Sequence, residues 1–413
     1  MASSTKDVMR NVFSNRNILT ISLTTTLWSV CNQAWQPFWS LYLKEELGAT
    51  VAIVGLLSMI QNAEMLLFQL PGGILADKIG RRKVILFGTC LRFIPPVVYL
   101  LATSWEHVLV AVIANASASI YSPALEAIVA DSLPRGQRGA GYGAYRMITS
   151  LPMVFMPTVG GIVMDALGYK AGVKIFNIAT FLAVIVVLLV RMKLVTETLA
   201  KKGKQRSTRA TFSSALKVPR TIWVMMIVAT LGGFAMRMVM QFISIYAKEV
   251  ILLSNTELGL AQTGGSLLSS ILIMPSGMLS DRIGRKPIIS VAQVIQPLTT
   301  WGIILVSVGS FPQYLLLRLF GGVGSALGGG FYGFAGGPAW QALVADLVPS
   351  ENRGTIMGLI STITGAIGAP SSLIGGYLYE GSPQTTFNIA LIIGLVSVPI
   401  FVLLVKEPKK GGE

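Results

Sequence analysis

The sequence has few ionisable side chains, and what it lacks excludes several classes of protein. Only 12% of its 413 residues are charged, against roughly 25% in a typical soluble domain. It has one histidine, and its two cysteines, Cys31 and Cys90, lie in apolar stretches, so neither a disulfide framework nor a metal site is indicated. A phosphate-binding loop of the form GxxxxGKS/T is missing. The sequence therefore predicts no enzyme, no catalytic residues, no metal and no cofactor.

Long apolar runs fill most of the chain instead. Hydrophobic residues make up 53% of it, and the mean hydropathy is +0.67. A membrane-spanning helix needs about 20 predominantly apolar residues. We therefore expect an all-α polytopic membrane protein with 12 transmembrane helices. The candidate spans are 18–43, 51–76, 84–103, 107–130, 139–164, 173–190, 221–247, 258–280, 287–311, 312–345, 354–379 and 385–405.

One charged turn occurs twice in the chain. Residues 73–83 read GILADKIGRRK, and residues 277–286 read GMLSDRIGRK. A constant offset aligns the residues around the two turns without a gap, and a slightly larger offset aligns the stretches that follow them. Such repeats predict that each half folds as the same six-helix bundle. We place the bundles at residues 1–190 and 221–413, joined by a basic cytoplasmic linker at 191–220.

The basic residues gather on one side of the predicted membrane. If the N-terminus is cytoplasmic, most of the 33 lysines and arginines fall in the tails and in the loops after even-numbered spans. Lysine and arginine near spans set membrane orientation, so this placement accounts for the net charge of +15 without a nucleic acid partner. We expect a multi-pass protein of the plasma membrane, surrounded by lipid, with both termini in the cytoplasm.

The turn GILADKIGRRK is similar to the signature loop between the second and third helices of the major facilitator superfamily. Its repeat lies where that family's second half has one. The resemblance implies two pseudo-symmetric six-helix bundles that rock about a midplane site and move a small solute by alternating access. It also implies a gating motif, which we assign to Gly73, Asp77, Gly80, Arg81, Arg82, Gly277, Asp281, Gly284 and Arg285.

Each part of this motif has a physical interpretation. Gly73 and Gly277 would allow close helix contact, and Gly80 and Gly284 would allow tight turns. In the family, the acid that matches Asp77 bonds with the opposite half and closes the cytoplasmic gate, and the residue that matches Arg81 joins that charge network. A loop that only sets membrane orientation is the alternative.

Four spans carry polar residues at helical spacing, so that each set shares one helix face. The sets are Ser29, Gln33, Gln36 and Ser40; Asn115, Ser119, Ser122 and Glu126; Arg237, Gln241 and Ser244; and Arg318, Gly322, Ser325 and Gly329. The resemblance assigns the central cavity to these four spans. Polar stripes can also join helices to one another, and that interpretation stays open.

Charged residues inside spans cost about 2.5–3.5 kcal/mol each on insertion scales, so each needs a partner or a function. Glu126 and Arg146 lie at similar depths on neighbouring spans, and we expect them to form a structural ion pair. Glu64 and Arg92 form either a second such pair or a proton-coupling site, because a carboxyl that alternates between a buried and a paired state can carry a proton.

Two further arginines complete the set. Arg318 is close enough to a span end to snorkel toward the membrane surface. Arg237 has no acid in its own span, and its repeat mate is the neutral Gln33. We therefore predict that Arg237 binds an anionic group of the solute. The competing interpretation is that an acid across the bundle neutralises it.

We predict a monomeric secondary active transporter for a small solute that carries a carboxylate or phosphate, with H⁺ as the coupling ion. The residues assigned to substrate binding or coupling are Arg237, Glu64, Arg92, Gln33, Gln36, Asn115, Glu126, Gln241 and Arg318. A membrane receptor or sensor and a lipid flippase are alternatives from other classes.

Multidrug efflux by proton antiport is the alternative within transport. Residues 37–45, PFWSLYLKE, resemble the end of the first helix in the drug:proton antiporter branch. The chain departs from that branch in its fourth span, which has no arginine, and in its fifth, where only Pro157-Thr-Val-Gly160-Gly161 remains of the antiporter signature.

Overall fold

A computed structural model describes residues 13–63, 65–133, 138–199, 220–328, 337–347 and 362–405. These residues are almost entirely helical, and no strand occurs in these ranges, which confirms the all-α prediction. They form two compact units. Unit 1 holds the described residues up to Ala49 and those from Ala63 to 199, and unit 2 holds Thr50–Asn62 and the described residues from 220 onward.

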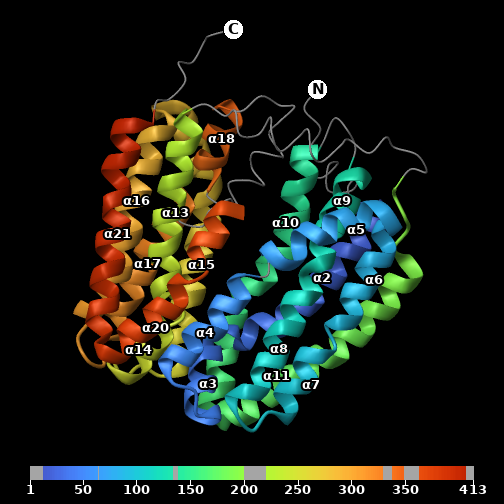
Figure 1. The fold of residues 1–413 in the computed structure, drawn as a ribbon, viewed down its shortest axis with the longest axis horizontal. Coiled ribbons are helices and arrows are strands. Elements are labelled where there is room, and N and C mark those ends of the chain that lie inside the picture. The colour runs from blue at the N-terminus through green and yellow to red at the C-terminus, as the bar shows by residue number, and fades with distance from the viewer. Residues whose placement is uncertain are drawn as a thin grey trace. The chain divides into compact units, whose positions relative to one another are not determined.

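Unit 1 is built of long helices with short irregular turns inside the spans (Figure 1). α11 bends sharply at Gly168, whose φ of 76° lies in the left-handed region that glycine adopts without strain. The elements are α2 (Arg16–Trp35), η1 (Gln36–Phe38), α3 (Trp39–Leu47), η2 (Met65–Gln69), α5 (Leu70–Ile79), α6 (Arg81–Leu91), α7 (Ile94–Leu101), α8 (Trp105–Ala118), η3 (Ser119–Tyr121), α9 (Ser122–Ser132), α10 (Arg138–Val154) and α11 (Met156–Leu194).

Unit 2 has the same style of construction, with α13, α16 and α21 packed together (Figure 1). In the tenth candidate span, 312–345, α17 ends at Leu327, and Gly328, which follows it, is left-handed. The elements are α4 (Val51–Asn62), α13 (Arg220–Met240), α14 (Ile243–Glu249), α15 (Asn255–Ile283), α16 (Arg285–Gly302), η4 (Ile303–Leu305), α17 (Phe311–Leu327), α18 (Pro338–Leu347), α20 (Ser371–Gly381) and α21 (Pro383–Leu404).

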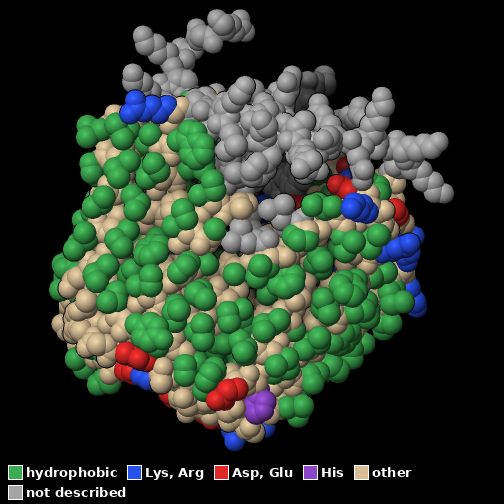
Figure 2. Space-filling view, in the orientation of Figure 1, with side chains coloured by type: hydrophobic (Ala, Val, Ile, Leu, Met, Phe, Trp, Pro, Cys, Tyr) green, Lys and Arg blue, Asp and Glu red, His purple; other side chains and the backbone are tan. Residues whose placement is uncertain are grey.

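The outer faces of the helices are apolar, as expected for a surface in contact with lipid. Figure 2 shows hydrophobic side chains along the sides of the helices, whereas most charged side chains in view lie toward the helix ends. Leu403 is 76% exposed and Met274 73%. Among the described residues, eight helical segments are long and apolar enough to cross a membrane. The protein is therefore a multi-pass membrane protein, and the count of twelve spans stays a prediction.

The sequence repeat reappears as equivalent helix contacts. In unit 1, a side chain at Gly160 of α11 would collide with the carbonyl oxygen of Ala34 on α2. In unit 2, a side chain at Gly375 of α20 would collide with the carbonyl oxygen of Met238 on α13. Both pairs are repeat mates in the sequence. The two units therefore use the same glycine contact to bring two helix backbones together.

The units differ from the predicted bundles at two places. α11 continues to Leu194, so the first residues assigned to the linker are helical. Thr50–Asn62, which the sequence places in the first bundle, belongs to unit 2 because α4 packs against α20. The predicted linker from residue 200 to 219 lies outside the described residues, and the predicted domain boundaries stay a prediction.

Candidate functional site

A group of polar and aromatic side chains surrounds Arg92 inside unit 1. Arg92 follows the last residue of α6, and its Nη1 donates to Oδ1 of Asn115 on α8 at 2.7 Å. Its guanidinium carbon lies 4.1 Å from the ring centroid of Trp28 on α2 and 5.5 Å from that of Tyr121 in η3. A cation over an aromatic face is stabilised by about 2 kcal/mol when both are removed from water. The structure thus brings together the predicted residues Arg92 and Asn115.

A second arginine also lies near the ring of Tyr121. Arg191 of α11 is only 2% exposed, and its guanidinium carbon is 5.4 Å from the Tyr121 ring centroid. It donates from Nε to Thr24 Oγ1 at 3.1 Å and from Nη1 to Thr89 Oγ1 at 2.9 Å. The sequence assigned Arg191 to the linker because it directly follows an apolar run. The available sequence signal was the presence of threonines in neighbouring spans, because their hydroxyl oxygens can accept hydrogen bonds from a buried arginine.

These two guanidinium groups have no carboxylate partner in the part of unit 1 that the structure describes. The recorded partners of Arg92 and Arg191 are an amide, hydroxyl groups and aromatic rings, and Nε of Arg92 is buried without a hydrogen-bond partner. Glu64, the predicted partner of Arg92, lies outside the described residues, so that pairing stays a prediction. The described site is cationic and lined by aromatic rings.

In unit 2 the predicted binding residue is Arg237. It is half-buried on α13, and its Nη1 is buried without a hydrogen-bond partner among the described residues. A Cβ atom on Gly368 would lie 2.5 Å from that nitrogen, so the guanidinium occupies the space which the missing side chain leaves. Ser372 of α20 donates from Oγ to the Arg237 carbonyl oxygen at 3.3 Å. Gln241 and Ser244, on the same predicted face, are half-buried.

Arg318 has a hydrogen-bond partner on a neighbouring helix, whereas Glu126 and Arg146 do not pair as predicted. Nη2 of Arg318 donates to Oε1 of Gln262 on α15. Glu126 and Arg146 are both exposed, and no ion pair joins them within the described ranges. The predicted ion pair is therefore wrong. The two side chains have similar depth in the sequence-based prediction, but each lies on an exposed face and they are not in contact.

The polar stripes are only partly available to a solute. Ser29, Ser40 and Ser119 are buried, and the Ser119 hydroxyl donates to the Ala116 carbonyl oxygen at 2.7 Å. Gln33 and Gln36 are half-buried. A buried serine that bonds to its own helix, as Ser119 does, serves packing and is not available to a solute.

The two charged turns have the same geometry in both units. Gly80 and Gly284 have φ values of 105° and 106°, so both predicted tight turns are present. Nη1 of Arg81 donates to the Ala127 carbonyl oxygen at 3.3 Å, and Nη1 of its repeat mate Arg285 donates to the Ala342 carbonyl oxygen at 2.7 Å.

The charged side chains of the first turn have different surroundings. Arg81 forms an ion pair with Asp131 at the end of α9, whereas Asp77 is exposed on α5. Arg82 donates from Nη2 to the Met192 carbonyl oxygen at 2.6 Å. Asp281 in the second turn also has an interaction partner. The gating roles of these residues stay predictions.

The close helix contact near the first turn is made by a different glycine from the predicted one. A Cβ atom on Gly73 would lie 3.7 Å from Pro123 Cβ, which is an ordinary contact. On the preceding residue, Gly72, it would collide with the Ile120 carbonyl oxygen and lie 2.8 Å from that carbonyl carbon. The prediction for Gly73 is thus wrong by one position, because helix rotation decides which glycine faces η3. Gly277, the repeat mate of Gly73, is half-buried.

The segment after α11 binds back onto the first turn through Glu197. Its carboxylate accepts the backbone N–H of Arg82 at 2.9 Å and those of Thr198 and Leu199 at 3.1 and 3.0 Å. Partial burial raises the pKa of the Glu197 carboxyl, but the N–H groups of Arg82, Leu199, Arg81 and Thr198 together outweigh it. The pKa therefore lies below its ordinary value of 4.5.

This shift predicts how the contact depends on pH. Because the folded-state pKa is lowered, the contribution to stability is complete above the ordinary pKa and is lost as pH falls through the folded value. Hydrogen exchange of the Arg82 amide, corrected for the intrinsic rate, should stay slow from pH 8 to 5 and accelerate below pH 4.5. Glu197→Gln should remove this step, and a step that persists in the variant would assign it to another group.

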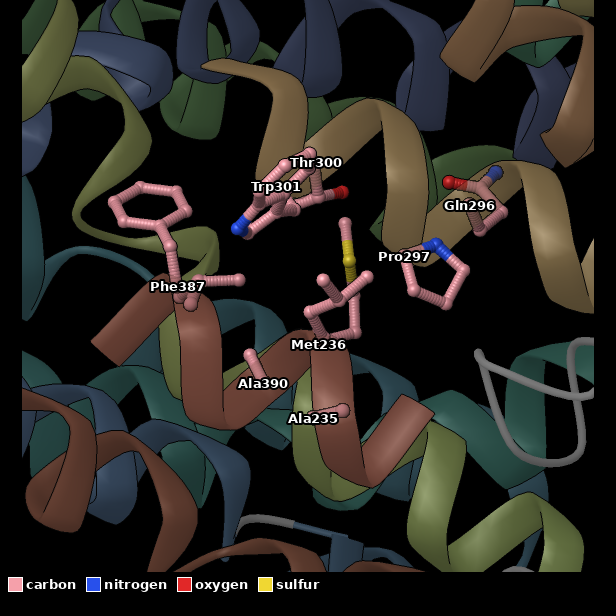
Figure 3. Close-up of a pocket in the computed structure, with 10 residues that line it drawn as sticks. Ala235, Met236, Gln296, Pro297, Thr300, Trp301, Phe387 and Ala390 are labelled. Carbon is pink, nitrogen blue, oxygen red and sulfur yellow. The ribbon is translucent and has the colours of Figure 1, made fainter. Parts of the chain in front are cut away.

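Unit 2 also contains an apolar pocket between α13, α16 and α21. Its empty volume is about 280 Å³, part of which is open to the outside. In Figure 3, Met236, Pro297, Trp301 and Phe387 surround this space, with Gln296 and Thr300 as polar neighbours. None of the predicted binding residues lines it. The pocket is therefore separate from the arginine sites.

Two named proteins are similar to this chain in sequence. The chain is 24% identical over 400 residues to an uncharacterized MFS-type transporter of Methanocaldococcus jannaschii, MJ1317, and 93% of each chain is covered. It is 27% identical over 177 residues to the quinolone resistance protein NorA of Staphylococcus aureus, with 42% of each chain covered.

Solved structures share the fold. The nucleoside transporter NupG superposes with a TM-score of 0.72 at 14% identity, covering 94% of this chain and 98% of that one. A D-xylose-proton symporter superposes with a TM-score of 0.73 at 15% identity, covering 94% and 98%. The family model described as the Major Facilitator Superfamily matches residues 21–253 and 249–413. The chain therefore belongs to the Major Facilitator Superfamily and is a transporter, not an enzyme.

Proposed function

We propose that this transporter is a secondary active one, driven by a proton gradient, for a small solute that carries a carboxylate or phosphate group. The observation that carries the proposal is the pair of arginines, Arg92 and Arg237, whose guanidinium groups have no acidic partner among the described residues. An unpaired charge in a low-dielectric interior is costly. An anionic group of the solute would supply the missing charge at either arginine.

Arg92 is suited to this role by its surroundings. Asn115 and Trp28 fix the plane of the guanidinium, and its Nε has no hydrogen-bond partner among the described residues. A planar guanidinium with free donors matches a carboxylate or phosphate better than an ammonium group does. Gln33 and Gln36 of unit 1 are half-buried and are assigned to the polar contacts that orient a solute at Arg92, and the half-buried Gln241 of unit 2 is assigned to the same role at Arg237.

Alternating access and the gating role of the charged turns complete the proposal. The turns around Gly80 and Gly284 are assigned to the cytoplasmic face, where Asp77, Arg81 and their repeat mates would control opening. Both termini are assigned to the cytoplasm and the protein to the plasma membrane as a monomer.

Multidrug efflux is the second candidate, and the likeness to NorA over 42% of the chain favours it. The aromatic faces of Trp28 and Tyr121 are of the kind that attracts a drug cation. Arg92 already lies over Trp28 and near Tyr121, however, so a cation would have to displace another cation. This arrangement favours an anionic solute.

Two consecutive experiments test the solute class and the energy source. A thermal-shift screen of the purified protein against carboxylates, sugar phosphates, uncharged sugars and drug cations, each at several pH values, should show stabilisation by the anionic compounds. With the stabilising compound as probe, reconstituted vesicles should accumulate it only when a proton gradient is present. Accumulation that survives collapse of both the proton and sodium gradients would contradict secondary active transport, and stabilisation by drug cations alone would favour efflux.

A further inference from the structure

The α4 and α20 helices of unit 2 lie in backbone contact along a seam. A Cβ atom on Gly55 of α4 would lie 2.5 Å from the Ser372 carbonyl oxygen, and one on Gly376 of α20 would lie 2.8 Å from the Val51 carbonyl oxygen. Glycines on both helices are what allow such an approach. We call the contact between Val51–Asn62 and Ser371–Gly381 the α4–α20 seam.

Polar contacts close the seam at both ends. At the start of α4, Oε1 of Glu380 accepts the Ala52 N–H at 2.9 Å, and the Thr50 side chain also bonds to this carboxylate. At the end of α4, Nδ2 of Asn62 donates to Oγ of Ser372 at 3.0 Å. Glu380 is the sole charged residue in the sequences of the two helices.

The position of Glu380 gives its charge a specific effect. The first N–H groups of a helix have no partner within the helix and carry the positive end of its dipole. Thr50 Oγ1 accepts one of them, the Ile53 N–H, at 3.3 Å. Glu380, on a different helix, accepts another of these groups, the Ala52 N–H. The same contact therefore caps α4 and holds α4 against α20.

The sequence repeat shows why this seam is unusual. Gly55 is the repeat mate of Gly259 on α15, so α4 is part of the first half of the duplicated chain. Its contacts are nevertheless with α20, and the chain changes units between Asn62 and Ala63, just before the π-helical turn η2. If the two repeats rock against each other, α4 and α20 have to separate.

The seam also reaches the candidate binding residue of unit 2. Ser372, which accepts the hydrogen bond from Asn62, donates to the Arg237 carbonyl oxygen. Four residues earlier, Gly368 abuts the Arg237 guanidinium. A displacement of the start of α20 would therefore change the surroundings of Arg237.

We propose that Glu380 is a positioning residue of the transport cycle, whose carboxylate latches the α4–α20 seam by capping α4 and must release Ala52 each time the seam opens. The proposal rests on the alternating access of the proposed function. It goes beyond that function by assigning the latch to one carboxylate and one helix end.

Spin-label distances test the latch directly. Labels on α4 at Ile53 and on α20 at Tyr377, which is 65% exposed, report the width of the seam in the full-length protein in lipid nanodiscs. Loss of a helix cap corresponds to a change in an equilibrium constant of about 2- to 30-fold. Glu380→Ala should therefore raise the ratio of separated to closed populations by that factor.

Two variants separate the latch from a general structural role. Glu380→Gln keeps an oxygen that can accept the Ala52 N–H but loses the charge, so it should give an intermediate ratio, and it replaces Glu380→Ala if that variant does not fold. Glu46→Ala removes an exposed glutamate from α3 and should leave the distances unchanged.

Each outcome decides between the two proposals. A graded shift from the unsubstituted protein through Glu380→Gln to Glu380→Ala supports the latch. Unchanged distances in Glu380→Ala would overturn it, whether or not the protein transports. Failure of the proposed function would appear separately, as vesicles of the unsubstituted protein that accumulate no anionic probe while the distance shift is still present.

Discussion

Replacing Gly72 by alanine is expected to inactivate the transporter, whereas the same change at the adjacent Gly73 is expected to leave it nearly unaffected. At Gly72 the new methyl group would collide with the Ile120 carbonyl oxygen and lie within 2.9 Å of the Ile120 Cα. Those are backbone atoms, which cannot rotate away. Overpacking of this kind typically costs about 1–3 kcal/mol, and here it would also displace η3, which carries Tyr121.

The adjacent position provides a matched control. A methyl group at Gly73 would meet only Pro123 Cβ at 3.7 Å, so the two variants differ in contact and not in composition or helix propensity. Melting temperature and the yield of monodisperse protein would measure the structural effect, and uptake into vesicles the functional one. Equal behaviour of the two variants would mean that α5 and η3 are not in backbone contact in the membrane.

Local features of the fold could be predicted from the sequence with little ambiguity. The glycine in each repeated charged turn predicts a tight turn, and both Gly80 and Gly284 have a positive φ. The repeat predicts that equivalent residues make equivalent contacts in the two units. The arginines that follow these glycines duly bind equivalent carbonyl oxygens, of Ala127 and Ala342.

Contacts between distant spans could not be predicted in the same way. Spacing along a helix shows which residues share a face, but not which neighbour that face meets. Asn115 was identified as polar and Arg92 as needing a partner, yet only packing shows that they bind each other across α6 and α8. Equal depth suggested that Glu126 pairs with Arg146, and depth proved insufficient. The choice between Gly72 and Gly73 likewise depends on helix rotation.

Arg191 shows a second limit of sequence interpretation. Hydropathy ends a span where the apolar run ends, so an arginine at that point reads as part of a cytoplasmic linker. In the structure α11 continues past it, and threonines from α2 and α6 surround its guanidinium. An arginine at a span end therefore says little about its own burial unless hydroxyl groups on neighbouring spans are considered with it.

The second large effect is expected at Arg92, where alanine should weaken binding of the anionic solute by about 10- to 150-fold. That range corresponds to the loss of one charge-assisted hydrogen bond of about 1.5–3 kcal/mol, and a bidentate contact would lose more. Arg92→Lys keeps the charge but loses the planar group that lies over Trp28, so it should rescue binding only in part. Isothermal titration with the compound found by thermal shift measures both.

Three comparisons make this result specific to an anion site at Arg92. Asn115→Ala removes the amide that orients the guanidinium at 2.7 Å and should weaken binding less than Arg92→Ala does. Arg237→Ala tests the second arginine, in unit 2, as a separate anion site. Arg318→Ala removes an arginine of unit 2 that is bonded to Gln262, and it serves as the comparison for the loss of one positive charge alone. A cationic solute that binds Arg92→Ala as tightly as the unsubstituted protein would reject the anion site and shift the function to multidrug efflux.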